Sequence, residues 1–328
     1  MSLDFDSARL PNRNLTSEHH EWRAQLRRFF DREVIPFAAQ WDEDGSIPSE
    51  LWPKAAAVGI LGLGYPEAYG GVSDGIDIWH KNILNEELAR IAVGGVSATL
   101  MVHGIGLPPV INFASEAIKS EVAPQVLAGT KRISLAITEP GAGSDVAHLS
   151  TTACLDGDHY VVNGAKTYIT GGMNANWFTT AVRTGGEGAG GVSTLLIAAD
   201  APGVSRTALD KKQGWWCSDT ATIYFDNVRV PVSHLIGEEN RGFKVIMNNF
   251  NAERMGMSAA MEAFSRVCLE DAVQWARERQ TFGQRLADHQ VIRHKIAEMK
   301  QRINATQAYL QLLSEQIQAG TEHAGDIA

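Results

Sequence analysis

The sequence predicts a mainly helical α+β fold, in which a small β domain separates two helical domains. Apolar residues recur at helical spacing up to residue 132, and short alternating runs separated by glycine turns follow. Helical spacing then returns and persists to the end of the chain. We therefore expect an N-terminal helical domain over 1–132, an antiparallel β sandwich or barrel over 133–236, and a C-terminal helical bundle over 237–328.

The first domain reads as a series of helices. Ser17 is placed to cap a helix with Trp22 and Leu26 on its apolar face, and this helix should end near Pro36. Further helices are expected over 49–59, 79–90 and 114–127, the last of them broken by Pro124.

The middle domain consists of short runs rich in β-branched and aromatic residues. These runs are ISLAIT (133–138), TTACLDGDHYVVNG (151–164), AKTYIT (165–170), WFTTAVRT (177–184), VSTLLIAAD (192–200) and TATIYFDNVRV (220–230). Asp156-Gly157 and Asn163-Gly164 are expected to form turns, and the glycine-rich stretch 185–191 a mobile surface loop.

The last domain begins with one long helix from about Gly242 to Gln280. A turn over 281–283 follows, and a second helix is expected from about Asp288 to Ala319.

Composition excludes several classes of protein. Of the 328 residues, 44% are apolar and 20% are charged, which suits a globular chain and not a disordered one. The net charge of −9 argues against nucleic acid as a partner and against a polybasic membrane anchor. The apolar stretches are shorter than the roughly 20 residues that a membrane span needs. No signal peptide is recognisable, and three distant cysteines suggest reduced thiols, so we expect a cytoplasmic protein.

Two segments of the β domain can carry a binding site. TEPGAGSD (138–145) runs from a strand into a glycine-containing loop, where backbone N–H groups and the hydroxyls of Thr138 and Ser144 can meet a ligand. NGAKTYITGG (163–172) places Tyr168 between threonines, which suits a flat heteroaromatic ring. Taken singly, the first segment is more simply interpreted as an ordinary turn and the second as a strand with one exposed aromatic residue.

The long helix carries NFNAERMGM (249–257). Glu253 and Arg254 are successive residues, about 100° apart around the axis, and so do not form a same-face pair. Arg254 falls in an apolar stripe and should lie partly buried near an anion. Glu253 has small residues beyond it, and it reads either as half of a buried ion pair or as a general base.

The connection RERQTFG (277–283), followed by His289-Gln290, is either a solvated turn or a donor-rich loop that reaches a phosphate or polar ring. His19 and His20 are expected to be exposed. No metal-ligand spacing, P-loop, GxGxxG or GxSxG is present, so no metal is expected.

Five segments together resemble the acyl-CoA dehydrogenase family of flavoproteins, in the same order and over essentially the whole chain. They are TEPGAGSD (138–145), NGAKTYITGG (163–172), CSDTATIYFDNVRVP (217–231), GFKVIMNNFNAER (242–254) and RERQTFGQRLADHQ (277–290). Relatives continue beyond two long helices, so the C-terminal bundle is expected to be incomplete in this chain.

The resemblance implies FAD as the cofactor, held by Leu135, Ile137, Thr138, Gly143, Ser144, Tyr168, Ile169 and Thr170. It implies that Arg279, Thr281, Phe282 and Gln290 reach the FAD of a neighbouring subunit, and hence a homodimer or homotetramer. Ser144, Asn251 and Arg254 would bind the CoA ester of the acyl-CoA substrate.

The implied reaction is α,β-dehydrogenation of an acyl-CoA to the trans-2-enoyl-CoA, with electrons passed to an electron-transfer flavoprotein in bacterial fatty-acid β-oxidation. Many members carry the catalytic base on a later C-terminal segment that this chain does not contain. In the isovaleryl-CoA and long-chain branch the base immediately precedes the arginine of the long helix, and Glu253 occupies that position in NAER.

Two other classes share these features. Flavin monooxygenases and acyl-CoA oxidases resemble the same family and react directly with O₂. A non-catalytic module that only binds acyl-CoA or FAD would also keep such segments. Retention of both flavin segments together with Glu253 favours the dehydrogenase.

Overall fold

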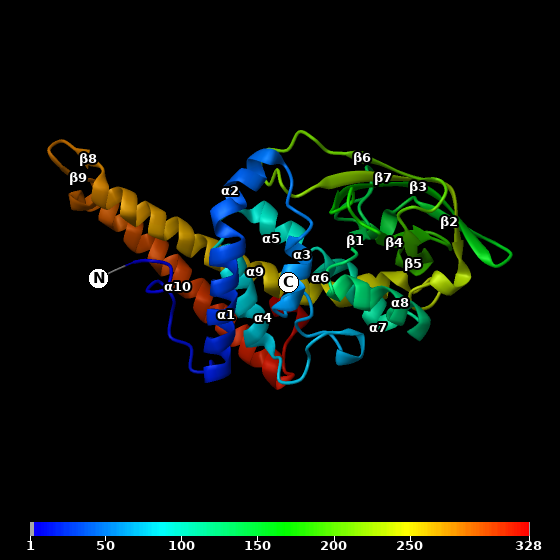
Figure 1. The fold of residues 1–328 in the computed structure, drawn as a ribbon, viewed down its shortest axis with the longest axis horizontal. Helices are drawn as coiled ribbons and strands as arrows, with labels where there is room; N and C mark the ends of the chain where they lie inside the picture. Colours follow the sequence, from blue (N-terminus) through cyan, green and yellow to red (C-terminus); the bar gives the residue numbers. More distant parts are fainter. Residues whose placement is uncertain (1–2, 328) are drawn as a thin grey trace. The chain divides into compact units, whose positions relative to one another are not determined.

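The structure is a computed structural model that describes residues 3–327. Helices, a sheet and then helices follow one another along the chain, in the order that the sequence predicts (Figure 1). The chain forms two compact units. The helical unit comprises Met1–Pro36, Ile76–Ala92 and Arg254–Ala328, and the sheet unit comprises Phe37–Gly75 and Val93–Glu253.

The helices before the sheet are α1 (Ser17–Glu33), α2 (Ile35–Asp44), α3 (Leu51–Ala57), α4 (Ile78–Ala89), α5 (Gly94–Leu100), α6 (His103–Gly106), α7 (Pro108–Phe113) and α8 (Glu116–Leu127), with the 3₁₀ helix η1 (Glu67–Tyr69) between α3 and α4. The sequence patterns did not predict α5, α6 or α7. These are short and rich in glycine or proline, so no helical period is visible in them.

Two helix boundaries differ from the prediction. The N-cap of α1 is Thr16 and not Ser17, and Pro36 lies in the first turn of α2, where its missing N–H costs nothing. Helix α8 continues through Pro124 without a break. An interior proline costs about 3 kcal/mol. Val122 and Val126 are buried in the same apolar cluster as Ile133, and tertiary packing of this kind supplies most helical stability in proteins.

The strands form one sheet in the order β1-β4-β2-β3-β7-β6, with β5 paired to β4. They are β1 (Ile133–Ala136), β2 (Thr152–Asp156), β3 (His159–Thr170), β4 (Trp177–Arg183), β5 (Val192–Ala198), β6 (Val204–Ala208) and β7 (Thr220–Pro231), and the short 3₁₀ helices η2 (Val146–His148), η3 (Ala189–Gly191) and η4 (Val232–His234) lie in the connections. Most pairs are antiparallel, as expected, but β1 runs parallel to β4 and so does β2 at Thr152.

Strand β3 corrects another expectation, because Asn163-Gly164 is not a turn. The two predicted runs on either side of it form one twelve-residue strand with a register shift against β7 at this point. Gly164 has φ +146°, and a Cβ there would lie 2.6 Å from Oγ1 of Thr151. Glycine is therefore required by a bulge, and not by a hairpin.

The long helix α9 (Gly242–Glu278) begins in the sheet unit. Its first turns place Ile246, Met247 and Phe250 in the same apolar cluster as Ile137 and Ala142 from the segment after β1. Each of these helix residues is one turn or less from the next, so a single face of α9 covers that segment.

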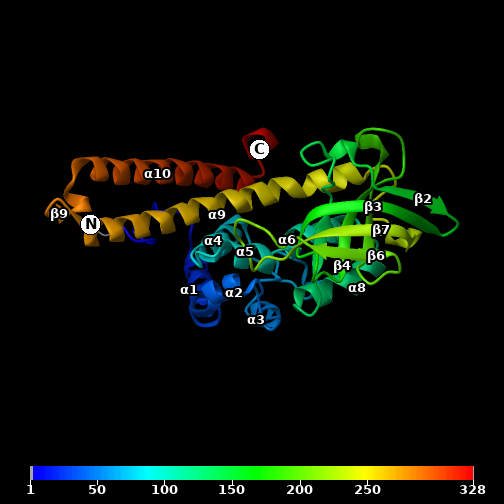
Figure 2. The ribbon, with the colours of Figure 1, turned by 90° about the horizontal axis from the view of Figure 1, so that it is seen from above.

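In the helical unit, α9 continues and the hairpin of β8 (Gln280–Thr281) and β9 (Gln284–Arg285), followed by η5 (Leu286–Asp288), joins it to α10 (Gln290–Ala319). The two long helices run antiparallel and side by side (Figure 2), and α11 (Ala324–Ile327) follows. Across 3–327 no single helix has both the length and the hydropathy of a membrane span; the bent pair Gly94–Leu100 and His103–Phe113 meets the test on length and composition alone.

Candidate active site

The loop after β1 carries the first group of predicted site residues. Glu139 and Ala142 exchange backbone hydrogen bonds of 2.9 and 3.1 Å, which closes a tight turn. Ile137 and Ala142 point into the core, whereas Gly143 and Ser144 are exposed and Thr138 is half-buried. The buried residues therefore anchor the turn in the core, and the exposed residues are available to a ligand.

The glycines of this loop are not required by the chain itself. A Cβ added at Gly141 or Gly143 would meet no atom within 4 Å, and neither residue has a positive φ. Open space beside two glycines leaves the backbone N–H groups free to approach a bound group. The loop thus has the form of a cradle for a cofactor with polar oxygens.

The second group lies on a bulge of β3. The register against β7 shifts between Lys166 and Ile169, and Tyr168 adopts φ +58° with 65% of its surface exposed. Ile169, the next residue, is buried. The bulge meets the loop after β1, because the N–H of Thr167 donates to the carbonyl of Thr138 at 2.8 Å. The two predicted cofactor segments are therefore neighbours.

Thr170, at the end of β3, opens onto a pocket of about 390 Å³. The pocket is also lined by Lys212, Gln213, Gly214, Trp215, Ser218 and Thr220. Lys212 is held in place, since its ammonium donates to the carbonyls of Trp215 and Ser218. Trp215 is 52% exposed. The residues before β7 line this pocket beside Thr170, and the sequence motifs did not identify them as candidate site residues.

The predicted base lies on α9. Glu253 and Asn251 are half-buried, and Glu253 follows Phe250 by one helical turn. The side chain of Phe250 packs on the cluster that contains Ile137 and Ala142. Nδ2 of Asn249 donates to the carbonyl of Ile105 at 3.1 Å, which fixes this part of the helix within the sheet unit. Arg254, also half-buried, is the first residue of α9 assigned to the helical unit.

The remaining predicted cofactor residues lie in the connection between α9 and α10, with Gln290 as the first residue of α10. Phe282 is 99% exposed at φ +51°, and Arg279 and Gln290 are exposed as well. Oγ1 of Thr281 lies 3.1 Å from Nε2 of His289, so this hairpin is braced from within. An almost fully exposed phenylalanine on a braced turn is typical of a contact residue for another molecule.

A histidine pair in the helical unit corrects the prediction for His19, which is buried. Nε2 of His19 and Nδ1 of His80 lie 3.0 and 2.8 Å from Oδ1 of Asp77. The group has the spacing of metal ligands, which the sequence did not reveal because its members are far apart. Each member already caps a helix: Asp77 accepts from two N–H groups of α4, and Thr16 N–H donates to His19. We therefore assign the group to helix capping.

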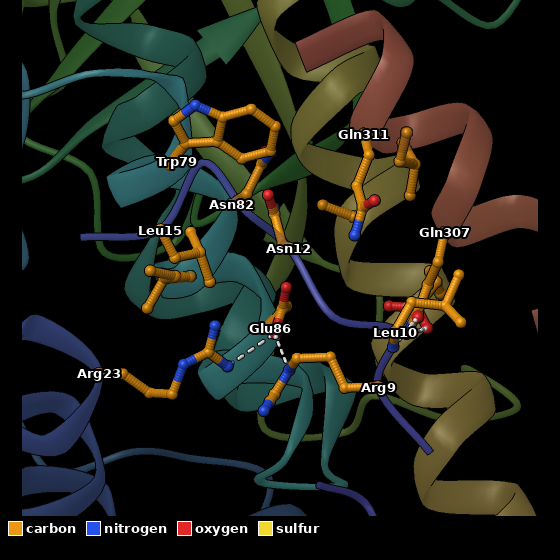
Figure 3. Close-up of a pocket in the computed structure, with 14 residues that line it drawn as sticks. Arg9, Leu10, Asn12, Leu15, Arg23, Trp79, Asn82, Glu86, Gln307 and Gln311 are labelled. Carbon is orange, nitrogen blue, oxygen red and sulfur yellow. Dashed lines mark hydrogen bonds and ion pairs between the residues drawn. The ribbon is translucent and has the colours of Figure 1, made fainter. Parts of the chain in front are cut away.

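A cavity of about 50 Å³ lies beside these helices and is also separate from the site (Figure 3). Glu86 projects from α4 toward it and receives hydrogen bonds from Arg9 and Arg23. Burial opposes ionisation of Glu86, but the surrounding arginines, with Arg266, outweigh this effect and lower its pKa to about 2. The volume suits a few water molecules, and the cavity is part of a structural ion network.

Known proteins match the chain over most of its length. Family models for the N-terminal, middle and C-terminal domains of acyl-CoA dehydrogenase match residues 16–130, 134–228 and 240–328. Acyl-CoA dehydrogenase AFT10-1 of Alternaria alternata is 37% identical over 97% of this chain and 78% of its own length. The mitochondrial long-chain specific acyl-CoA dehydrogenase of Sus scrofa is 35% identical over 91% of this chain and 69% of its own length.

Solved structures agree with these matches. A probable acyl-CoA dehydrogenase from Mycobacterium abscessus superimposes with a TM-score of 0.91 at 44% identity, over 95% of this chain and 83% of its own. A glutaryl-CoA dehydrogenase from Mycobacterium smegmatis, solved in complex with FADH2, superimposes with a TM-score of 0.87 at 26% identity, over 95% of this chain and 79% of its own.

Proposed function

The chain belongs to the acyl-CoA dehydrogenase family of flavin-dependent oxidoreductases, and we propose that Glu253 is its catalytic base. In the reaction the α C–H bond of an acyl-CoA thioester gives up a proton, the β C–H bond gives up a hydride, and the trans-2-enoyl-CoA forms. The observation that carries the proposal is the meeting of loop 138–144 with the Tyr168 bulge in the same compact unit as Glu253.

The family binds FAD, which when bound accepts the hydride of the substrate. The residues that would hold it lie on the loop and bulge described above. They are Leu135, Ile137, Thr138, Gly143, Ser144, Tyr168, Ile169 and Thr170. Ile137 and Ile169 are buried and would contribute backbone groups, whereas the hydroxyls of Thr138, Ser144 and Thr170 would contribute hydrogen bonds.

The proton transfer is the step that requires a base. A thioester α-proton is weakly acidic, so a carboxylate must be held against the α-carbon while donors stabilise the enolate oxygen. Glu253 is half-buried, one turn beyond Phe250, on the face of α9 that covers the loop after β1. Ser144, Asn251 and Arg254 would bind the CoA ester beside it.

Assembly and electron transfer complete the proposal. The exposed hairpin with Arg279, Thr281, Phe282 and Gln290 would reach the FAD of a neighbouring subunit in a homodimer or homotetramer. An electron-transfer flavoprotein would accept the electrons, and the enzyme would act in the cytoplasm in bacterial fatty-acid β-oxidation.

The base is tested with Glu253→Gln and a panel of acyl-CoA thioesters. The variant should still bind acyl-CoA but reduce the flavin at least about a hundredfold more slowly, because the carboxamide cannot accept the proton. Stopped-flow bleaching of the flavin under anaerobic conditions measures this rate. Asp271→Asn is the matched control, since Asp271 is an exposed carboxylate on the same helix and should behave as the wild type.

Bleaching by Glu253→Gln at the wild-type rate would rule out Glu253 as the base. The same mixing experiment separates the competing classes of protein. A dehydrogenase passes electrons to an artificial acceptor and reoxidises slowly in air, whereas an oxidase or monooxygenase reoxidises rapidly with O₂. A non-catalytic module would take up FAD and acyl-CoA without any bleaching.

A further inference from the structure

An ion pair is fully buried beneath the two proposed cofactor segments. Nζ of Lys166 lies 2.7 Å from Oε1 of Glu139, and the two residues are 0% and 4% exposed. Lys166 also donates to the carbonyl of Ile137 at 3.0 Å. The Glu139 carboxylate accepts from the N–H and hydroxyl of Ser150 and from the N–H of Thr151. Both charged groups are thus well supplied with partners.

Each member of the pair belongs to a different segment. Glu139 lies in the turn between Thr138 and Gly143, and Lys166 is the last residue of β3 before the register shift that ends at Ile169. The segments are also joined by the hydrogen bond from Thr167 N–H to the carbonyl of Thr138 and by that from Lys166 to the carbonyl of Ile137. The buried pair and these bonds therefore connect the loop directly to the strand that carries the bulge.

The pair does not itself face a ligand. Gly143 and Ser144 on the loop and Tyr168 on the bulge are exposed, whereas Glu139 and Lys166 point inward. A buried ion pair is a poor source of stability, because desolvation offsets most of the attraction, but its directional bonds specify one arrangement of the segments that carry it. The position of the pair between the two segments therefore indicates that it sets the geometry of the site and adds little to the stability of the fold.

We infer that Glu139 and Lys166 form a positioning pair for the cofactor site, which holds loop 138–144 in register with the Tyr168 bulge. This inference rests on the proposed function, because the site that the pair positions is the proposed FAD site. Burial lowers the pKa of Lys166 to about 8, while Lys166 and the Ser150 and Thr151 donors overcome burial and hold the pKa of Glu139 at about 2. The pair is therefore ionised at neutral pH.

The test compares Lys166→Met, Glu139→Gln and the double variant with the wild type. FAD is titrated into the apoprotein and followed by quenching of flavin fluorescence, the visible circular dichroism of the bound flavin is recorded, and the thermal midpoint of each apoprotein is measured. Arg229→Met is the matched control, because it breaks the exposed pair of Arg229 with Asp156 in the same sheet without touching either segment.

We expect each single variant to lower the thermal midpoint, because it leaves one buried charge without its partner. The double variant should recover most of that midpoint, since neither charge remains. All three should weaken FAD binding by about 10-fold or more, as at metal sites when a residue that orients the ligands is removed, and should alter the flavin circular dichroism. The control should match the wild type in FAD affinity and dichroism.

Two results would overturn the inference: single variants that bind FAD with wild-type affinity and spectrum, or a double variant that recovers FAD affinity together with its midpoint. If the single variants do not fold, the double variant alone decides between these outcomes. A wild-type protein that takes up no FAD would instead contradict the proposed function, so the two failures are distinguishable.

Discussion

Single residues of the sheet unit hold backbone conformations that their sequence does not favour. Tyr168 adopts φ +58°, which costs a non-glycine residue on the order of 1 kcal/mol or more, and it stays there because its neighbours are held in place. Lys166 is ion-paired, Thr167 is hydrogen-bonded to the carbonyl of Thr138, and Ile169 is buried. The result is an exposed aromatic ring at a defined place on the sheet.

His103 supplies a prediction at this scale. Burial lowers its pKa to about 4, and its Nε2 lies 3.0 Å from the carbonyl of Leu61, so it is neutral at pH 7. The unfolded chain binds this proton near pH 6.5, so stability falls as pH drops from about 6.5 toward 4. We expect a loss from this residue of about 2 kcal/mol between pH 7 and 5.

Urea unfolding at pH 7 and pH 5 measures this loss. His103→Gln keeps a donor for Leu61 but has no titration, so the difference between the two pH values should shrink by about that amount. His20→Gln is the control, because His20 is exposed on α1 and the variant should keep the wild-type difference. An equal pH dependence in wild type and His103→Gln would contradict the prediction.

Among the elements, α1 and α4 are joined by charge as well as by apolar packing. Glu87 on α4 is 0% exposed, and its carboxylate receives hydrogen bonds of 3.0 Å from Arg27 on α1 and from Arg90. Three apolar residues of α1, Leu26, Phe29 and Phe30, are also buried. The contact with Arg27 favours one register of the two helices, because the carboxylate of α4 has to meet a guanidinium group of α1.

Removing this carboxylate tests the joint. Glu87→Ala leaves Arg27 and Arg90 without their buried partner, and we expect the free energy of unfolding to fall by about 3 kcal/mol. Chemical denaturation followed by far-UV circular dichroism measures the change. Glu21→Ala on the exposed face of α1 should change it by less than about 0.5 kcal/mol. Similar effects of the two substitutions would show that the joint contributes no more than a surface charge.

For the whole molecule, the compact units do not follow the order of the chain. The helical unit gathers segments from the N-terminal and C-terminal parts, and α9 carries the chain from one unit into the other. Apolar burial holds these segments together. One apolar cluster contains Phe5, Ala89 and Ala263, each from a different segment. Segments distant in sequence are thus required for the same core.

Assembly gives a prediction at this scale. The hairpin side chain of Phe282 is 99% exposed, so Phe282→Asp should leave folding unchanged but weaken the proposed homo-oligomer, because burying a carboxylate at an interface is costly. Light scattering coupled to size-exclusion chromatography should show a smaller species at micromolar concentration. Leu155→Asp, at an exposed position on β2, is the control and should keep the wild-type mass. A wild-type mass for Phe282→Asp would exclude this hairpin from the interface.

The sequence predicted which segments form the candidate site more accurately than it predicted the backbone conformation of those segments. It singled out Tyr168 and the loop from Thr138 to Ser144, which the structure brings together, but it expected a turn at Asn163-Gly164 where a bulge exists. An Asn-Gly pair suits either geometry, and only the partner strand decides between them. The assignments of Glu253 and of the hairpin residues stay predictions until their variants are measured.

The sequence by itself determined the family, the succession of helical, β and helical regions, and the residue types available to the site, because periodicity and sequence motifs are local properties. Tertiary structure alone decided that Glu139 pairs with Lys166, that His19 is buried beside Asp77, and that Pro124 lies inside a helix. Each of these depends on atoms distant in sequence, and contacts between distant segments leave no periodic signal in either one.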